Sequence, residues 1–136
     1  MTKALVIVVL TALIAVGVGY TWLRYYKSDQ LHQKLAKMAL EVNKNNPKML
    51  DADTRLDKVT SSNEKFVYSY TLMNATSGKV NFDTLAPKLK SQFAKQLCTT
   101  KGWGTLLEDG ARVEYFYSGN DGKPIGRVTI TSSDCK

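Results

Sequence analysis

The 136-residue chain has room for one membrane-spanning segment and one small domain, which excludes a multidomain enzyme. Its composition, 43% hydrophobic and 23% charged, excludes a disordered, collagen-like or multi-span protein. The net charge of +7 resembles that of nucleic-acid-binding proteins. However, Lys3, Arg24 and Lys27 flank an apolar run, and the +4 that remains without these three is ordinary for a small domain.

The apolar run at residues 4–23 carries no charge. A helix of this length reaches about 30 Å, the thickness of the hydrocarbon core of a bilayer. Aromatic and basic side chains cluster where the run ends, as they do in a headgroup layer: Tyr20, Trp22, Arg24, Tyr25, Tyr26 and Lys27. We therefore predict a cytoplasmic tail at residues 1–3, a transmembrane signal-anchor at 4–27 in contact with the lipid bilayer, and a domain at 28–136.

The same run has a second interpretation, a signal peptide that is removed. Lys3 gives a short basic start, residues 4–16 give an apolar centre, and the small residues 17–19 suit a cleavage site. A lipoprotein of the usual form is excluded, because no cysteine lies directly after the apolar run, where the lipid would be attached.

The orientation of the anchor rests on two opposed signals. More basic residues follow the run than precede it, which favours a cytoplasmic domain. A domain longer than about 60 residues is translocated largely regardless of nearby charge, and a cysteine pair suits an oxidising compartment. We expect a single-pass protein of the inner (cytoplasmic) membrane with its domain in the periplasm.

The first helix of the domain is expected to begin at Ser28 or Asp29, either of which can cap it, and to end at residues 45–47. Its apolar residues follow one stripe of a 3.6-residue period: Leu31, Leu35, Met38 and Val42. Because little separates this helix from the span, we expect the two to be nearly continuous.

An alternating pattern after Pro47 predicts two strands. The stronger covers residues 66–72, where aromatic residues alternate with smaller ones. A weaker strand at about 54–60 precedes it, and residues 61–64 suit the turn of a hairpin. A polar loop follows at 74–81.

A second helix is expected after Asp83, its N-cap, with Phe82 packed on the first turn. Its apolar residues recur every four positions: Leu85, Leu89, Phe93 and Leu97. Two strands, around 113–117 and 125–131, finish the chain with a turn at 119–122. This order predicts the α+β class, an αββαββ domain with an antiparallel sheet and helices on one face.

The two cysteines, Cys98 and Cys135, could join the last hairpin to the second helix. Such a bond adds about 4 kcal/mol in the loop-entropy model. A zinc site would need two more ligands, and a redox pair favours the Cys-x-x-Cys spacing. We favour a structural disulfide, with free buried thiols as the alternative.

Residues for catalysis do not assemble in the sequence. His32 is the only histidine, and no serine or cysteine nucleophile can be placed beside it. Glu108 and Asp109 are adjacent, whereas paired acid–base carboxylates face each other across a cleft. We predict no enzyme, no cofactor, no metal and no small-molecule substrate, with a small periplasmic hydrolase as the least favoured alternative.

The strand aromatics beside lysines resemble a base-stacking platform, but arginine is scarce and alternating aromatics usually form a core. We therefore predict no nucleic-acid partner. Trp103, between two glycines, either caps the edge of the core or protrudes. If it protrudes, Trp103, Leu106 and Leu107 form the patch that binds a partner.

Three features of the C-terminal half occur together: a helix that ends at Cys98, the segment Leu106-Leu107-Glu108-Asp109-Gly110, and two strands before Ser132-Ser133-Asp134-Cys135. In this pattern the chain resembles the small disulfide-bearing α/β pilotins of bacterial type II secretion. The resemblance implies a periplasmic domain, with Cys98 joined to Cys135, that binds a segment of another protein. Those pilotins carry a lipidated cysteine at the mature start, where this chain has the apolar run.

The sequence therefore predicts a single-span, periplasm-facing protein-binding module. It would act as an accessory, chaperone-like or inhibitory subunit of a bacterial envelope complex, with another envelope or secretion-system protein as its partner. The alternative is an immunity or superinfection-exclusion protein that neutralises an incoming toxin or phage component.

Overall fold

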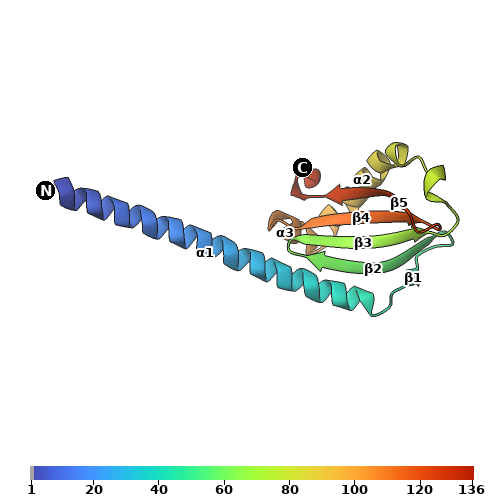
Figure 1. The fold of residues 1–136 in the computed structure, drawn as a ribbon, viewed down its shortest axis with the longest axis horizontal. Coiled ribbons are helices and arrows are strands. Elements are labelled where there is room, and N and C mark those ends of the chain that lie inside the picture. Colours follow the sequence, from blue (N-terminus) through green and yellow to red (C-terminus); the bar gives the residue numbers. More distant parts are fainter. Residues whose placement is uncertain (1) are drawn as a thin grey trace.

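A computed structural model describes residues 2–136, apart from the side chains of residues 2, 4 and 5. Helix α1 (Thr2–Asn43) is continuous and projects from the domain as a rod (Figure 1). Its side chains are exposed from residue 6 to residue 30, and burial begins at Leu31. The expected continuity of span and helix is present. The predicted cap is wrong, because Ser28 and Asp29 lie inside α1 and begin no new helix.

Five strands form one mixed sheet in sequence order: β1 (Lys48–Met49), β2 (Thr54–Ser62), β3 (Lys65–Leu72), β4 (Arg112–Gly119) and β5 (Pro124–Ile130). Neighbouring strands are antiparallel except β3 and β4, which are parallel. The α+β class is confirmed, but a wholly antiparallel sheet is wrong. Helices α2 (Phe82–Thr99) and α3 (Trp103–Glu108) lead the chain back to the end where β3 begins, so β4 runs in the same direction as β3.

The ends of the predicted elements shift by a few residues. The side chain of Asn81, not Asp83, caps α2 by accepting a hydrogen bond from the Thr84 N–H at 3.3 Å. The polar loop before α2 contains the short 3₁₀ helix η1 (Ser77–Lys79). The two-residue β1, which the sequence did not predict, pairs with β2 through Leu56 and Arg55.

In Figure 1 helix α2 lies behind the sheet and α1 runs along its β2 edge, and the core fills the space between the helices and the sheet. Phe66, Val113 and Ile130 from three strands are fully buried there. The Trp103 ring of α3 meets the edge of the Phe66 ring, with centroids 5.3 Å apart. The strand aromatics Phe66, Tyr70, Tyr115 and Tyr117 are buried and therefore form a core face, as predicted.

The disulfide predicted between Cys98 and Cys135 is present, with the two Cα atoms 5.5 Å apart. It joins the last turn of α2 to the C-terminal 3₁₀ helix η2 (Ser132–Cys135). Lys90 of α2 and Asp134 of η2 form an ion pair at 3.0 Å beside it. Thus a chain end that would otherwise fray is held against the helix.

Candidate functional site

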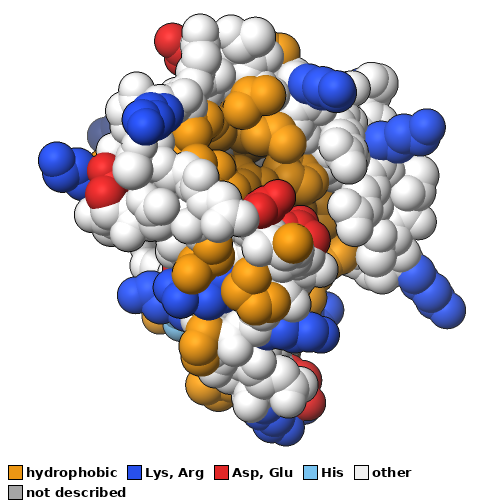
Figure 2. All heavy atoms as spheres, turned by 90° about the vertical axis from the view of Figure 1, so that its right-hand side faces the viewer, with side chains coloured by type: hydrophobic (Ala, Val, Ile, Leu, Met, Phe, Trp, Pro, Cys, Tyr) orange, Lys and Arg blue, Asp and Glu red, His pale blue; other side chains and the backbone are white. Residues whose placement is uncertain are grey.

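An apolar hollow of about 330 Å³ opens at one end of the domain, and we call it the distal groove. In Figure 2 the hydrophobic side chains form a hollowed area on the face that points away from the N-terminus of α1. The groove is lined by residues of β2–β5, α2 and two loops: Leu50, Asp51, Thr54, Tyr70, Leu72, Val80, Phe82, Leu85, Leu89, Phe93, Tyr117 and Ile125.

The start of α2 forms one wall of the groove. The first turn of α2 stands over the beginning of β5, where Phe82 packs on Gly126. A Cβ atom at Gly126 would overlap the Phe82 ring. The absence of a side chain at this one position therefore lets Phe82 lie close to the sheet, and its ring centroid is 6.1 Å from that of Tyr117.

Stacked aromatic rings make the floor of the groove. Tyr70 of β3 and Tyr117 of β4 have centroids 5.2 Å apart, and Tyr115 lies against Phe93 of α2 at 3.9 Å. Burial raises the pKa of Tyr117 to about 12. Burial, together with the neighbouring tyrosines, raises the pKa of Tyr70 and Tyr115 further. The floor is therefore uncharged at neutral pH and fixed in shape by packing.

The rim of the groove combines apolar side chains with one carboxylate. Leu50 is 51% exposed and Leu85 is 44% exposed, although both are apolar. The carboxylate of Asp51 accepts hydrogen bonds from the N–H groups of Asp53 at 2.8 Å and Thr54 at 2.7 Å. These bonds lower the pKa of Asp51, so the rim carries a negative charge at neutral pH.

Of the two interpretations of Trp103, the structure supports the core, so the patch that it would form with Leu106 and Leu107 is not on the surface. Their exposed fractions are 9%, 9% and 1%, so these residues belong to the core. They sit at the other end of the domain from the distal groove (Figure 1). One signal in the sequence pointed to the groove instead. The apolar stripe of α2 includes Leu85, which is 44% exposed although it is apolar.

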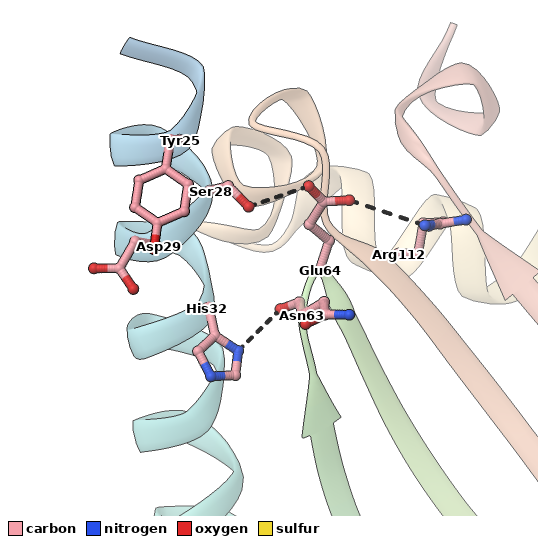
Figure 3. A pocket seen from close by; sticks show the side chains of 7 residues that line it. All are labelled: Tyr25, Ser28, Asp29, His32, Asn63, Glu64 and Arg112. Carbon is pink, nitrogen blue, oxygen red and sulfur yellow. Dashed lines mark hydrogen bonds and ion pairs between the residues drawn. The ribbon is translucent and has the colours of Figure 1, made fainter. Parts of the chain in front are cut away.

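A second, polar cavity of about 410 Å³ lies where α1 meets the domain, and we call it the junction pocket. Figure 3 shows its lining: Tyr25, Ser28, Asp29, His32, Asn63, Glu64 and Arg112. The sequence placed no nucleophile beside His32, yet Ser28 shares this pocket. The Ser28 hydroxyl donates to Glu64 at 3.5 Å, and His32 Nδ1 lies 3.4 Å from the carbonyl oxygen of Asn63. The two side chains are thus each engaged with a partner on the β2–β3 turn.

Metal binding has little support among the described residues. Within residues 2–136, no three His, Cys, Asp or Glu side chains lie close enough together to hold an ion. Both cysteines are in the disulfide.

The solved structures that resemble this chain share its fold at low sequence identity. A "putative secreted protein" of Pseudomonas aeruginosa is 18% identical, with a TM-score of 0.70 over 81% of this chain and 96% of its own. EpsS, the type 2 secretion pilotin of Vibrio vulnificus, is 17% identical, with a TM-score of 0.66 over 82% and 96%. AspS, the type II secretion pilotin of Vibrio cholerae, is 13% identical, with a TM-score of 0.60 over 82% and 97%.

The fold predicted from the resemblance is therefore confirmed as pilotin-like. A search of curated protein sequences gave no match. A sequence model of the family described as "Putative quorum-sensing-regulated virulence factor" matches residues 25–136, which is the domain together with the domain-proximal part of α1. The chain belongs to this family.

Proposed function

We propose that this protein is an accessory protein-binding module of a bacterial envelope complex, and that its distal groove holds an apolar segment of another envelope protein. The observation that carries this proposal is the groove itself, a fixed apolar hollow with exposed Leu50 and Leu85 on its rim. Exposed apolar clusters of this kind are typical of protein interaction sites. The pilotin fold supports an accessory role in secretion.

The partner segment is inferred from the chemistry of the groove. The floor of tyrosine, phenylalanine and leucine favours two or three aliphatic or aromatic side chains that fill the hollow. Asp51 at the rim favours a lysine or arginine beside them, because its carboxylate stays ionised. Such a segment would anchor by burial and gain its orientation from the ion pair.

We further propose that α1 holds the domain at the inner membrane, with the domain in the periplasm. The helix is long and apolar enough to span a bilayer, and a removed signal sequence passes the same test. Residues 1–3 would form the tail, 4–27 the anchor and 28–136 the periplasmic domain. From Arg24 to Asn43, α1 would lift the groove about 30 Å beyond the hydrocarbon core. The groove faces away from the N-terminus of α1, so it would open toward the periplasm (Figures 1 and 2).

Photo-crosslinking in intact cells tests the role of the groove. A benzophenone amino acid at Leu85 should cross-link to one envelope protein, and Leu89→Arg in the same chain should abolish that product. Leu40 is the matched control, an exposed leucine (71%) on α1 that lies outside the groove. Equal cross-linking from Leu40, or a product that contains only a second copy of this chain, would contradict the proposal.

A further inference from the structure

We propose that the junction pocket binds the headgroup of a phosphatidylethanolamine lipid, a zwitterion with a primary ammonium group and a phosphate. This inference rests on the proposed anchoring of α1 in the bilayer. It concerns the pocket between α1 and the β2–β3 turn, and it is independent of the distal groove.

The position of the pocket matches the headgroup layer. Tyr25 and Ser28 follow the end of the uncharged run at Leu23 by two and five residues. At about 1.5 Å per residue they lie about 3 and 8 Å beyond the hydrocarbon core. The headgroup layer on each side of a bilayer is about 5–8 Å thick. A lipid next to α1 would therefore place its polar end at the mouth of the pocket.

The charges in the pocket match both ends of the zwitterion. Glu64 and Arg112 stand next to each other across the pocket from α1 (Figure 3). Their closest charged atoms, Glu64 Oε2 and Arg112 Nη2, are 3.9 Å apart, at the outer limit of an ion pair. Both side chains are partly exposed, at 39% and 50%. Each therefore keeps capacity for a ligand, the carboxylate for an ammonium group and the guanidinium for a phosphate.

The α1 side of the pocket suits the ammonium group. The Tyr25 ring forms a wall above Asp29 and Ser28 in Figure 3. A primary ammonium group has three N–H donors, which the Glu64 carboxylate and the Ser28 hydroxyl oxygen can accept, while an aromatic face attracts its charge. The donors of a primary amine distinguish this headgroup from choline, whose quaternary nitrogen has no N–H.

The test compares lipids bound to the full-length protein in nanodiscs. Discs with equal amounts of phosphatidylethanolamine and phosphatidylcholine are used, and native mass spectrometry counts the lipids that stay on the released protein. We expect phosphatidylethanolamine to be retained about fivefold over phosphatidylcholine, in line with one charge-assisted hydrogen bond at a solvated site.

Three variants assign this preference to the pocket. Glu64→Gln and Arg112→Gln remove one charge each, and Ser28→Phe fills the pocket without changing charge. Glu64→Gln and Ser28→Phe should bring the ratio to about one, because they remove or block the acceptors of the ammonium group. Arg112→Gln removes the contact to the phosphate, which both lipids carry, so it should lower the retention of both and leave their ratio unchanged. Glu41→Gln is the matched control, since Glu41 is an exposed acid (70%) on α1 outside the pocket, and it should keep the wild-type ratio.

Several results would overturn the assignment. These are an equal retention of the two lipids, a preference that survives Glu64→Gln and Ser28→Phe, or a stronger retention of phosphatidylglycerol, which would indicate general attraction to basic residues. Free phosphoethanolamine is also tested on the protein in discs of pure phosphatidylcholine. Binding as strong as that of the lipid would show that the pocket takes a soluble ligand. Failure of the proposed anchor is distinguishable from failure of the headgroup site, because a protein without an anchor would not enter the discs at all.

Discussion

The side chain of Asn43 makes two hydrogen bonds to the backbone of Val59, as a neighbouring strand would. Its amide nitrogen donates to the Val59 carbonyl at 2.6 Å, and its amide oxygen accepts from the Val59 N–H at 2.7 Å. Val59 is 1% exposed, on the stretch of β2 that the two-residue β1 does not reach. The last residue of α1 therefore satisfies both backbone groups of a buried strand residue, and it fixes the rod to the sheet.

Asn43→Ala should lower the free energy of unfolding by about 3 kcal/mol, because it leaves a buried N–H and a buried C=O without partners. Urea unfolding of the detergent-solubilised protein, followed by circular dichroism, measures this change. Asn45→Ala is the control, since Asn45 is exposed and close in sequence. A loss for Asn43→Ala no larger than that for Asn45→Ala would show that the two hydrogen bonds add nothing.

Replacement of both cysteines by serine should lower the free energy of unfolding by about 4 kcal/mol, because residues 98–135 would no longer form a closed loop in the unfolded chain. Thermal unfolding with and without dithiothreitol measures the effect. The wild-type protein should lose stability in reductant, and the double variant should not respond. A reductant effect of equal size on both proteins would contradict the role assigned to the bond.

Gly126→Ala should disturb the distal groove, because the added methyl group overlaps the Phe82 ring and forces it away from the sheet. We expect a loss of about 1–3 kcal/mol in stability and a lower yield of the Leu85 cross-link. Gly78→Ala is the matched control, as nothing lies within 4 Å of a Cβ atom at Gly78. Unchanged cross-linking in Gly126→Ala would mean that the position of Phe82 does not shape the binding surface.

Alkaline pH should unfold the domain through its buried tyrosines. Burial raises the pKa of Tyr117 to about 12, and raises those of Tyr68, Tyr70 and Tyr115, from an ordinary value of 10.0. A raised pKa in the folded state means that stability is complete below about pH 10 and falls as the pH rises toward 12. Circular dichroism against pH tests this, and Tyr117→Phe should move the midpoint to higher pH. If the midpoint of unfolding lies below pH 9, the titration of a group other than these tyrosines must cause it.

Trp103→Ala should act on stability and leave partner binding intact. Trp103 is buried against Phe66, so its removal leaves a cavity and should cost about 3–5 kcal/mol. The Leu85 cross-link, measured well below the melting temperature, should keep its wild-type yield. A stable Trp103→Ala protein that has lost the cross-link would restore the interpretation of Trp103 as a contact residue.

Most elements of this fold could be predicted from local sequence, because they have a period or a cap within a few residues. The stripe from Leu31 to Val42 and the alternation over residues 66–72 depend only on neighbours in the chain. The parallel pairing of β3 with β4 could not be predicted in this way. It depends on where the chain lies after α2 and α3, which no local pattern records.

The distal groove was missed for the same reason. Phe82 reaches Tyr117 and Gly126, and Leu50 reaches the same hollow from the loop before β2, only after the sheet has assembled. The disulfide was accessible to sequence reasoning because two cysteines allow a single internal pairing. Trp103 was ambiguous, since its glycine neighbours suit an exposed turn and a tight turn into the core equally well.

The proposal that α1 holds a disulfide-bonded domain outside the cytoplasm is best tested by thiol labelling of Cys98 and Cys135 in intact cells. A membrane-impermeant maleimide is applied with and without an impermeant reductant, and the membrane fraction is then analysed. We expect no labelling without reductant and labelling of both cysteines after it. Free thiols that react only once the cells are lysed, in a protein recovered from the soluble fraction, would contradict the claim.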